Sequence, residues 1–466
     1  MTTASAPASR VVDRAESARL WQGRFVSGIT SIPEQAVITV HQPKQTKAVP
    51  KRMKCFCHAF LRPPSPLACP SVGKGSRRTM QGNPMQTLDD FAARRLSALE
   101  KRQLSRVLHE TGRDSSPWVM RGGRRMLSLS CNDYLNLSTH PATIRAAIDA
   151  TAQFGVGAGG SRLVTGNHPL YTALEARLAA LKGSEAAIVF GSGFLANIGI
   201  IPALIAPNDL ILVDELAHAC IHAGAALAHA RTIRFPHNDM QALAGLLEQE
   251  RPQHDHVLIV TDGVFSMDGD LAPMSALVEL SARYNAWLMT DDAHGIGVLN
   301  EGHGSAYGHD VPLQMGTLSK AVGAYGGYLC ASAPVVALIR NRARSFIYTT
   351  GLPPGTLAAA ITALDLIAAD PALTMQPLTK ARLFTRLAGL PDAQSPIVPI
   401  LLGSAEAALS ASAMLAEHDY LAAAIRPPTV PAGTARLRLT FTALTPDSDI
   451  MRLAELIRPL LSDTAG

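Results

Sequence analysis

The sequence predicts an α/β fold with a mostly parallel sheet, helices on both of its faces, and a smaller α+β domain at the C-terminal end. Between residues 186 and 318, short apolar runs alternate with Ala- and Leu-rich stretches of helical character. Such alternation is typical of parallel sheets covered by crossover helices. After Pro353-Pro354 the pattern changes to long helices separated by two strand-like runs. With 47% hydrophobic and 17% charged residues, the composition is that of an ordinary globular protein.

Each element is predicted from its local pattern. Apolar and charged residues recur at helical spacing from 88 to 108, and an apolar run at 126–130 predicts a short strand. The strands expected in the large sheet lie at 186–190, 210–213, 256–261, 287–290 and 313–318, and those of the smaller domain at 397–402 and 436–442.

The length of 466 residues allows two or three domains. We divide the chain into a basic extension at 1–84, an N-terminal segment at 85–135 that joins the small domain, a large cofactor-binding domain at 136–348 and a small C-terminal domain at 349–466. The extension is rich in Ser, Pro, Arg and Lys. Its proline content favours a disordered extension or a misplaced start over a targeting segment. We therefore expect a cytoplasmic protein, or an organellar one if the extension is a transit peptide.

The positive charge of the chain lies in this extension. The formal net charge is +5, but residues 1–80 hold 13 Lys/Arg against 3 Asp/Glu, which leaves 29 against 34 for the rest. A slightly acidic body offers no broad positive field, so we expect no nucleic-acid partner. The six cysteines do not suggest a disulfide framework, and the C-x-C-H spacing that begins at Cys55 is not a standard zinc site.

One uncharged stretch is long enough to span a bilayer, from Glu185 to Asp209. Gly191-Ser192-Gly193, Asn197 and Pro202 divide it into a strand, a glycine turn and a helix. We therefore predict a buried core segment and no membrane span.

Two familiar spacings fail their structural requirements. The glycine cluster at 155–160 follows a predicted helix instead of a strand, so it does not predict a dinucleotide site. His218 and His222 lie four residues apart on a predicted helix, but no Glu follows His218 as the zinc-protease motif requires. We expect no metal site.

A carboxylate, an imidazole and a lysine follow two successive strands. Asp291 and His294 come at the end of the 287–290 strand, and Lys320 follows the 313–318 strand. Open α/β sheets bind ligands at this edge. Singly, each feature is weak, because a lysine after a strand is usually a surface charge. Upstream, the strand-to-helix turn at 192–194 offers backbone amides to a phosphate, so together these features suit an aldehyde cofactor that carries a phosphate.

These residue types fit pyridoxal phosphate (PLP). The amine of Lys320 can form a Schiff base, and partial desolvation lowers its pKa so that it can act as nucleophile and base. Asp291 can keep the pyridine nitrogen protonated, which makes the ring an electron sink. His294 can hydrogen-bond the ring hydroxyl, His218 can stack on the ring, and Ser266 and Thr317 supply hydroxyls.

Five motifs extend this hypothesis. They are Ser-Cys-Asn-Asp-Tyr-Leu at 130–135, Thr-Asp-Gly-Val-Phe-Ser-Met-Asp-Gly at 261–269, Asp-Asp-Ala-His-Gly at 291–295, Thr-Leu-Ser-Lys at 317–320 and Arg-Pro-Pro-Thr-Val-Pro at 426–431. Jointly they resemble the α-oxoamine synthases, PLP enzymes of fold type I that join an amino acid to an acyl-CoA. The resemblance runs from about residue 85 to the C-terminus, and residues 160–163 and 426–438 resemble the biotin-pathway member most.

The resemblance implies a role for each site residue. Lys320 would be the Schiff-base lysine, His218 the stacking residue and Asp291 the partner of the ring nitrogen. Further cofactor contacts are implied at Ser192, Gly193, Phe194, Ser266, His294, Thr317 and, from the second subunit of a homodimer, Thr349 or Thr350. Substrate contacts are implied at Arg438 and Arg426 for the amino acid, and at Thr429 and Arg106 for the acyl group. Three positions depart from the family pattern, namely Asn136, Tyr171 and Leu444.

The resemblance also implies a reaction, the decarboxylative condensation of L-alanine with a pimeloyl thioester of CoA or acyl carrier protein. Sibling synthases that use other substrates, such as glycine C-acetyltransferase, 5-aminolevulinate synthase and serine palmitoyltransferase, share every catalytic group named above. An aminotransferase on the same fold is a more distant alternative. A non-catalytic protein that binds nucleic acid through its basic extension would not need Lys320, Asp291 and His218.

Overall fold

The computed structural model describes residues 87–462 apart from 103 and 115. The predicted extension at 1–84, with Cys55 and its neighbours, lies outside the described residues. Within the described part, no single helix is long and apolar enough to cross a membrane; α10 (Pro354–Ala369) and α11 (Pro371–Ala388) pass that test only as a pair bent by 84°.

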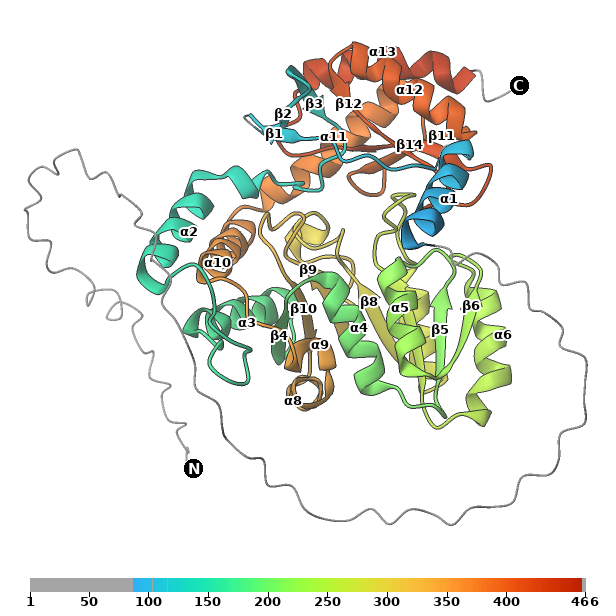
Figure 1. Ribbon diagram of the computed structural model, residues 1–466. Helices are drawn as coiled ribbons and strands as arrows, with labels where there is room; N and C mark the ends of the chain where they lie inside the picture. Colours follow the sequence, from blue (N-terminus) through green and yellow to red (C-terminus); the bar gives the residue numbers. More distant parts are fainter. Residues whose placement is uncertain (1–86, 103, 115, 463–466) are drawn as a thin grey trace, which may run out of the picture. The chain divides into compact units, whose positions relative to one another are not determined.

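A seven-stranded sheet forms the centre of the larger part of the chain (Figure 1). Its strands are, in spatial order, β4 (Ala186–Phe190), β10 (Gly327–Ala331), β9 (Leu313–Thr317), β8 (Trp287–Asp291), β7 (Val257–Asp262), β5 (Leu210–Asp214) and β6 (Arg231–Phe235). Only β10 runs antiparallel to its neighbours, β4 and β9. The mostly parallel sheet predicted from the apolar runs is confirmed.

Helices cover both faces of this sheet, so its central strands are buried along their whole length, as is usual for parallel sheets. Side chains that alternate along the strands feed separate cores on the two faces. One face carries α4 (Gly193–Leu204), α5 (Ala219–Ala228), α8 (Ala333–Arg342) and α9 (Arg344–Ile347). The other carries α3 (Pro169–Lys182), α6 (Met240–Glu250), α7 (Met274–Arg283) and α10, with α2 (Pro141–Phe154) packed against α10.

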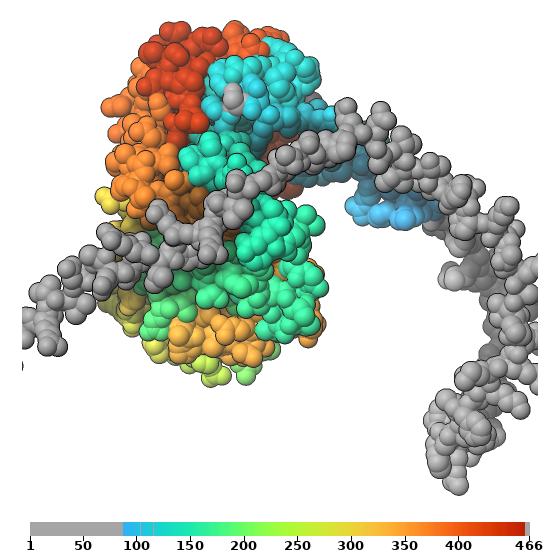
Figure 2. Space-filling view, turned by 90° about the vertical axis from the view of Figure 1, so that its left-hand side faces the viewer, coloured from blue at the N-terminus to red at the C-terminus, as the bar shows by residue number. Residues whose placement is uncertain are grey.

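The C-terminal part contains an antiparallel sheet of β11 (Ile397–Gly403), β14 (Ala435–Thr440) and β13 (Ala423–Ile425). A second small sheet is formed by β1 (Thr111–Arg113), β2 (Trp118–Arg121), β3 (Arg124–Ser128) and β12 (Tyr420–Leu421). Because β3 pairs with β12, the N-terminal segment joins the C-terminal part, and Figure 2 shows the two side by side in cyan and red. One core is shared by both sheets, α11, α12 (Ala405–Glu417) and α13 (Asp447–Ser462).

The first described helix is shorter than predicted. Thr87 caps α1 (Leu88–Lys101), and its Oγ1 accepts a hydrogen bond from the N–H of Asp90 at 3.1 Å. The helix ends at Lys101 instead of reaching residue 108, and none of its residues is buried. Because no face of this helix is buried, no tertiary contact stabilises further helical turns after Lys101. Short 3-10 turns occur at η1 (Leu137–Thr139), η2 (Arg251–Gln253) and η3 (Asn300–Gly302).

Two departures from the family pattern are accommodated by local hydrogen bonds. Asn136 has a left-handed backbone (φ 57°), a conformation that Gly adopts freely and Asn tolerates. Its Nδ2 donates to Ser116 Oγ at 2.7 Å and its Oδ1 accepts from the Leu444 N–H at 3.0 Å. Tyr171 is buried, and its hydroxyl accepts a hydrogen bond from the Leu352 N–H at 2.5 Å.

Candidate active site

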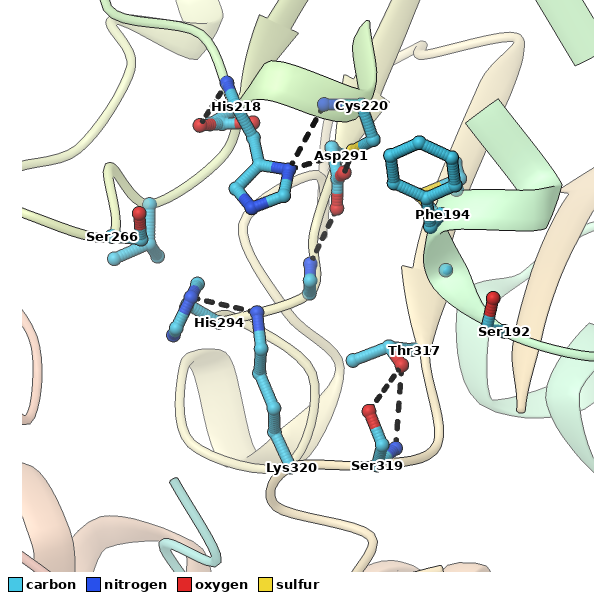
Figure 3. A pocket seen from close by; sticks show the side chains of 15 residues that line it. Ser192, Phe194, His218, Cys220, Ser266, Asp291, His294, Thr317, Ser319 and Lys320 are labelled. Carbon is cyan, nitrogen blue, oxygen red and sulfur yellow. Dashed lines mark hydrogen bonds between the residues drawn. The ribbon is translucent and has the colours of Figure 1, made fainter. Parts of the chain in front are cut away.

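One cavity of about 200 Å³ lies at the carboxyl edge of the large sheet (Figure 3). Strands β7, β8 and β9 end at this edge, and their last residues are followed by loops that turn into the cavity. The cavity is lined by all the predicted catalytic and cofactor-binding residues except Thr350, namely Ser192, Gly193, Phe194, His218, Ser266, Asp291, His294, Thr317 and Lys320. Residues far apart in the sequence therefore meet in one place.

The Lys320 amine points into this cavity and lies 2.7 Å from His294 Nε2. Burial lowers the pKa of Lys320 to about 8, although Asp291 and Asp262 oppose the effect. The positive charge of Arg438 adds to the lowering. A large fraction of Lys320 is thus a neutral amine near pH 8, as a nucleophile or base must be.

His294 is a neutral imidazole held at both nitrogens. Burial, followed by the positive charges of Lys320 and Arg438, lowers its pKa well below the ordinary value. Its Nδ1 lies 2.7 Å from the hydroxyl of Tyr134. A neutral ring that accepts from the Lys320 amine at Nε2 carries its proton on Nδ1 and donates it to Tyr134.

Asp291 ends β8, and both of its carboxylate oxygens are fixed. Oδ1 accepts from the Ala293 N–H at 3.0 Å, and Oδ2 accepts from Asn197 Nδ2 at 2.7 Å. Asn197, on α4, is completely buried, and its Nδ2 also contacts Cys220 Sγ at 3.0 Å. Burial raises the pKa of Cys220 to about 12, so this thiol stays protonated beside the carboxylate.

His218 lies before α5 as its N-cap residue, so the prediction that it lies within a helix is wrong. Its backbone N–H donates to Asp262 Oδ2 at 3.1 Å, which anchors the residue to the end of β7. Its Nδ1 lies 2.7 Å from Cys220 Sγ. Burial lowers the pKa of His218; Asp291 opposes this effect and Lys320 reinforces it. His218 therefore presents a neutral aromatic ring to the cavity.

The start of α4 forms the opposite end of the cavity. Ser192 caps the helix, and its Oγ accepts from the Leu195 N–H at 3.1 Å. Backbone N–H groups of a first helical turn have no intrahelical acceptor and favour an anion. A Cβ atom at Gly193 would lie 3.3 Å from Met315 Cε and 3.4 Å from Thr317 Cβ, so glycine lets the helix end come close to β9.

Arg438 comes from β14 in the C-terminal part. It is buried, and its Nε donates to the carbonyl oxygen of Ser266. Its terminal nitrogens contact Asn132 Oδ1 at 3.1 Å and the Tyr134 hydroxyl at 3.5 Å. The guanidinium therefore lies beside the same tyrosine as His294.

Five predicted residues do not line this cavity, namely Arg438 and the four described next. Thr429 lines a neighbouring cavity of about 590 Å³ that also touches His218 and Ser266. Arg426 is half-buried and Arg106 is exposed, and neither lines these two cavities. Thr350 forms an isolated bridge with Ser161.

Several residues of the site were not predicted. Asp262, Asn132 and Tyr134 lie inside motifs that carried the family resemblance, so a signal for them existed. Asn197 and Cys220 carried none, because each lies in an apolar helical stretch where only packing reveals its neighbour.

The chain is similar to several known proteins. Residues 124–457 match the family model of class I and II aminotransferases. An 8-amino-7-oxononanoate synthase of Granulibacter bethesdensis is 98% identical over 82% of this chain and 100% of its own length. One from Beijerinckia indica is 56% identical over 81% of this chain and 99% of its own length. The chain belongs to the 8-amino-7-oxononanoate synthases of the class I and II aminotransferase family.

Solved structures lead to the same family. A variant serine palmitoyltransferase from S. paucimobilis with a bound PLP–myriocin aldimine superimposes with a TM-score of 0.75 at 26% identity, covering 81% of this chain and 98% of that chain. An 8-amino-7-oxononanoate synthase from Francisella tularensis superimposes with a TM-score of 0.63 at 26% identity, covering 73% and 99%. The predicted resemblance and fold class are confirmed.

Proposed function

We propose that this chain is the PLP-dependent acyltransferase that condenses L-alanine with a pimeloyl thioester to 8-amino-7-oxononanoate in biotin biosynthesis. The observation that carries the proposal is the Lys320 amine, held 2.7 Å from a neutral His294 in the cavity that Asp291 also lines. Relatives named for this activity support the choice of substrates. The acyl donor is a thioester of CoA or of acyl carrier protein.

The residues present fit the aldehyde, the ring nitrogen and the phosphate of PLP. Lys320 supplies an amine for the aldehyde, and Asp291 a carboxylate for the ring nitrogen. Oδ1 of Asp291 accepts one hydrogen bond, from the Ala293 N–H, and keeps a second lone pair. The first turn of α4 and the hydroxyl of Thr317 suit the phosphate, because backbone amides there favour an anion. His218 and Ser266 line the cavity between these ends.

When bound, PLP supplies an electron sink for the electron pair left at the α-carbon of the amino acid. The amine of Lys320 takes the α-proton of alanine and later returns a proton to the same carbon. His294 Nε2 accepts a hydrogen bond from this amine and so orients it. The buried Arg438 binds the carboxylate of the substrate, since a guanidinium forms paired hydrogen bonds with a carboxylate. Asp291 would hold the ring nitrogen through its carboxylate, which the Ala293 N–H and Asn197 keep in place.

The overall reaction balances. A bond forms between the α-carbon of alanine and the carbonyl carbon of the pimeloyl group. The thioester C–S bond breaks, and the thiolate leaves and takes up a proton. The bond from the α-carbon to its carboxylate then breaks, CO₂ departs, and a proton replaces it. No oxidant or reductant is needed.

We also propose that the working unit is a cytoplasmic homodimer. Thr350 lies outside the cavity, and α1 exposes Leu88 and Phe91 with none of its residues buried. Both observations are expected if a second subunit covers α1 and contributes a threonine to the site. The described cysteines are all free, which fits a reducing compartment.

The test is an absorbance scan of the purified protein beside two variants. The wild type should show the visible band of bound PLP, and Lys320→Ala should lose it. Lys380→Ala is the matched control, because Lys380 pairs with Asp447 on the C-terminal part. If the wild type shows no such band after incubation with PLP, the proposal fails.

Substrate choice needs a second measurement. With carbon-13 alanine, glycine or serine offered against pimeloyl-CoA, mass spectrometry should find the label mainly in the alanine-derived product. Faster turnover of glycine or serine would assign the chain to a sibling synthase. Keto-acid formation without any thioester would indicate an aminotransferase.

A further inference from the structure

His237 lies outside the site and joins two carboxylates from different parts of the chain. Its Nδ1 lies 3.0 Å from Asp214 Oδ1, and its Nε2 lies 2.7 Å from Asp270 Oδ2. The next residue, Asn238, reinforces both contacts, since its N–H donates to Asp214 Oδ2 at 2.9 Å and its Nδ2 to Asp270 Oδ2 at 3.1 Å. His237 and Asn238, which follow β6, therefore connect the segment of Asp214 to the segment of Asp270.

Each of these segments carries a residue of the site. Asp214 is the last residue of β5, and the chain runs from it directly to His218. Asp270 closes the turn that contains Ser266, because its carbonyl oxygen accepts from the Phe265 N–H at 3.0 Å. The ring of Phe265 meets the His237 ring edge to face, with centroids 4.3 Å apart. A shift at His237 would thus move both His218 and Ser266.

The Ser266 turn is held from its other side by β14. Arg436 pairs with Asp268, and Arg438 donates to the Ser266 carbonyl oxygen. His237 is the counterpart of these arginines on the large-sheet side. The turn is therefore bound by cationic side chains on two sides, by the two arginines on one side and by His237 on the other.

The charges around His237 favour its protonated form. Asp214 is completely buried, Asp270 is partly exposed, and Glu215 Oε1 accepts from the His237 backbone N–H at 3.0 Å. Among the described residues, no lysine or arginine forms an ion pair with any of these three carboxylates. Burial alone would lower the pKa of His237, but its hydrogen bonds to Asp214 and Asp270 raise it to about 10. A buried carboxylate is costly without such a cation.

We propose that His237 is a positioning residue that sets the spacing of His218 and Ser266 across the cofactor cavity by bridging Asp214 and Asp270. It touches neither substrate nor cofactor. Its effect is on cofactor affinity and on the order of the turn at 263–271. The inference rests on the proposed PLP function of the cavity.

The test compares PLP affinity and amide hydrogen exchange in His237→Phe with the wild type. Phenylalanine keeps a ring against Phe265 and removes both hydrogen bonds. The dissociation constant for PLP, measured by fluorescence titration of the apoprotein, should rise about tenfold or more. Exchange at 263–271 should accelerate. His256→Gln is the matched control, because His256 pairs with Asp209, which directly precedes β5 at the end far from Asp214. This change should leave both readouts unchanged.

Asp270→Asn provides a second, milder variant with a pH readout. One carboxylate fewer lowers the pKa of His237, so the ring loses its proton at a lower pH than in the wild type. The ratio of the variant and wild-type dissociation constants should therefore grow between pH 7 and 9.5. Titration of Lys320 affects both proteins and cancels in this ratio. Wild-type affinity in His237→Phe, or a ratio that does not change with pH, would overturn the proposal. A wild type that binds no PLP would instead refute the proposed function.

Discussion

Substitution of Lys182 by Met should destabilise the protein strongly, because Lys182 and Asp292 form an ion pair with no exposure to solvent. Lys182 Nζ lies 2.7 Å from Asp292 Oδ2 and also donates to the His303 carbonyl oxygen. Without this lysine, the side chain of Asp292 keeps a single hydrogen bond, from the Ser305 N–H at 3.0 Å. The variant therefore leaves a negative charge inside the protein with no cation.

The expected cost is about 3–5 kcal/mol of unfolding free energy, the range found when one partner of a buried ion pair is removed. The exposed pair Arg145–Asp149 sets the lower reference. Its loss in Arg145→Ala should cost about 0.3–0.5 kcal/mol. The double variant Lys182→Met, Asp292→Asn removes the unpaired charge and should recover about 2 kcal/mol of the sum of the single losses.

Urea unfolding followed by intrinsic fluorescence measures these differences in unfolding free energy, provided that the dependence of the free energy on urea concentration is the same in all variants. Asp292 adjoins Asp291, so the same variant should also bind PLP more weakly. A loss below about 1 kcal/mol in Lys182→Met, or strict additivity in the double variant, would refute the reasoning that the pair is buried and mutually dependent.

Three further predictions concern the site and its support. The rate of PLP capture by the apoprotein should rise about tenfold per pH unit below pH 8 and level off above pH 8, because Lys320 reacts as the neutral amine and its pKa is about 8. Stopped-flow absorbance measures this rate. A rate that does not change from pH 6 to 8 would contradict the prediction. Asn197→Leu removes the donor to Asp291 Oδ2 and should weaken PLP binding by about 10- to 100-fold, as expected for a hydrogen bond to a charged group; an unchanged titration would exclude this role. Asn136→Ala should cost about 1–2 kcal/mol for its left-handed backbone and about 1 kcal/mol for each of two lost hydrogen bonds. Asn136→Gly should lose only the hydrogen-bond part, and equal losses in urea unfolding would show that the backbone term is absent.

Local patterns were sufficient for most of the large sheet. Its central strands are continuous apolar runs because both faces are buried, and such runs are visible in the sequence. Two strands were missed. β6 lies at the edge with mostly exposed side chains, and β10 is a five-residue run that starts with glycine and runs antiparallel. The mostly exposed β6 resembles a loop, whereas β10 is a short run in which all five residues are buried.

The sequence by itself determined that Asp291 and Lys320 would share an edge of the sheet, because parallel strands place their carboxyl ends together. The family resemblance assigned roles to His218, Ser266 and Arg438. Only the tertiary structure decided which groups surround them. Asn197 reaches Asp291 from α4, and Arg438 reaches the Ser266 turn from β14. These contacts join residues that no local periodicity relates, since they depend on how whole helices and sheets pack.

The protonation states also came from the packing. Nothing in the sequence indicates that burial and neighbouring cations keep His294 neutral, or that two carboxylates keep His237 charged. Both are single histidines in polar segments. The electrostatic field at a side chain is set by all the groups that folding brings near it. The sequence therefore shows where the histidines are but not which of them are charged.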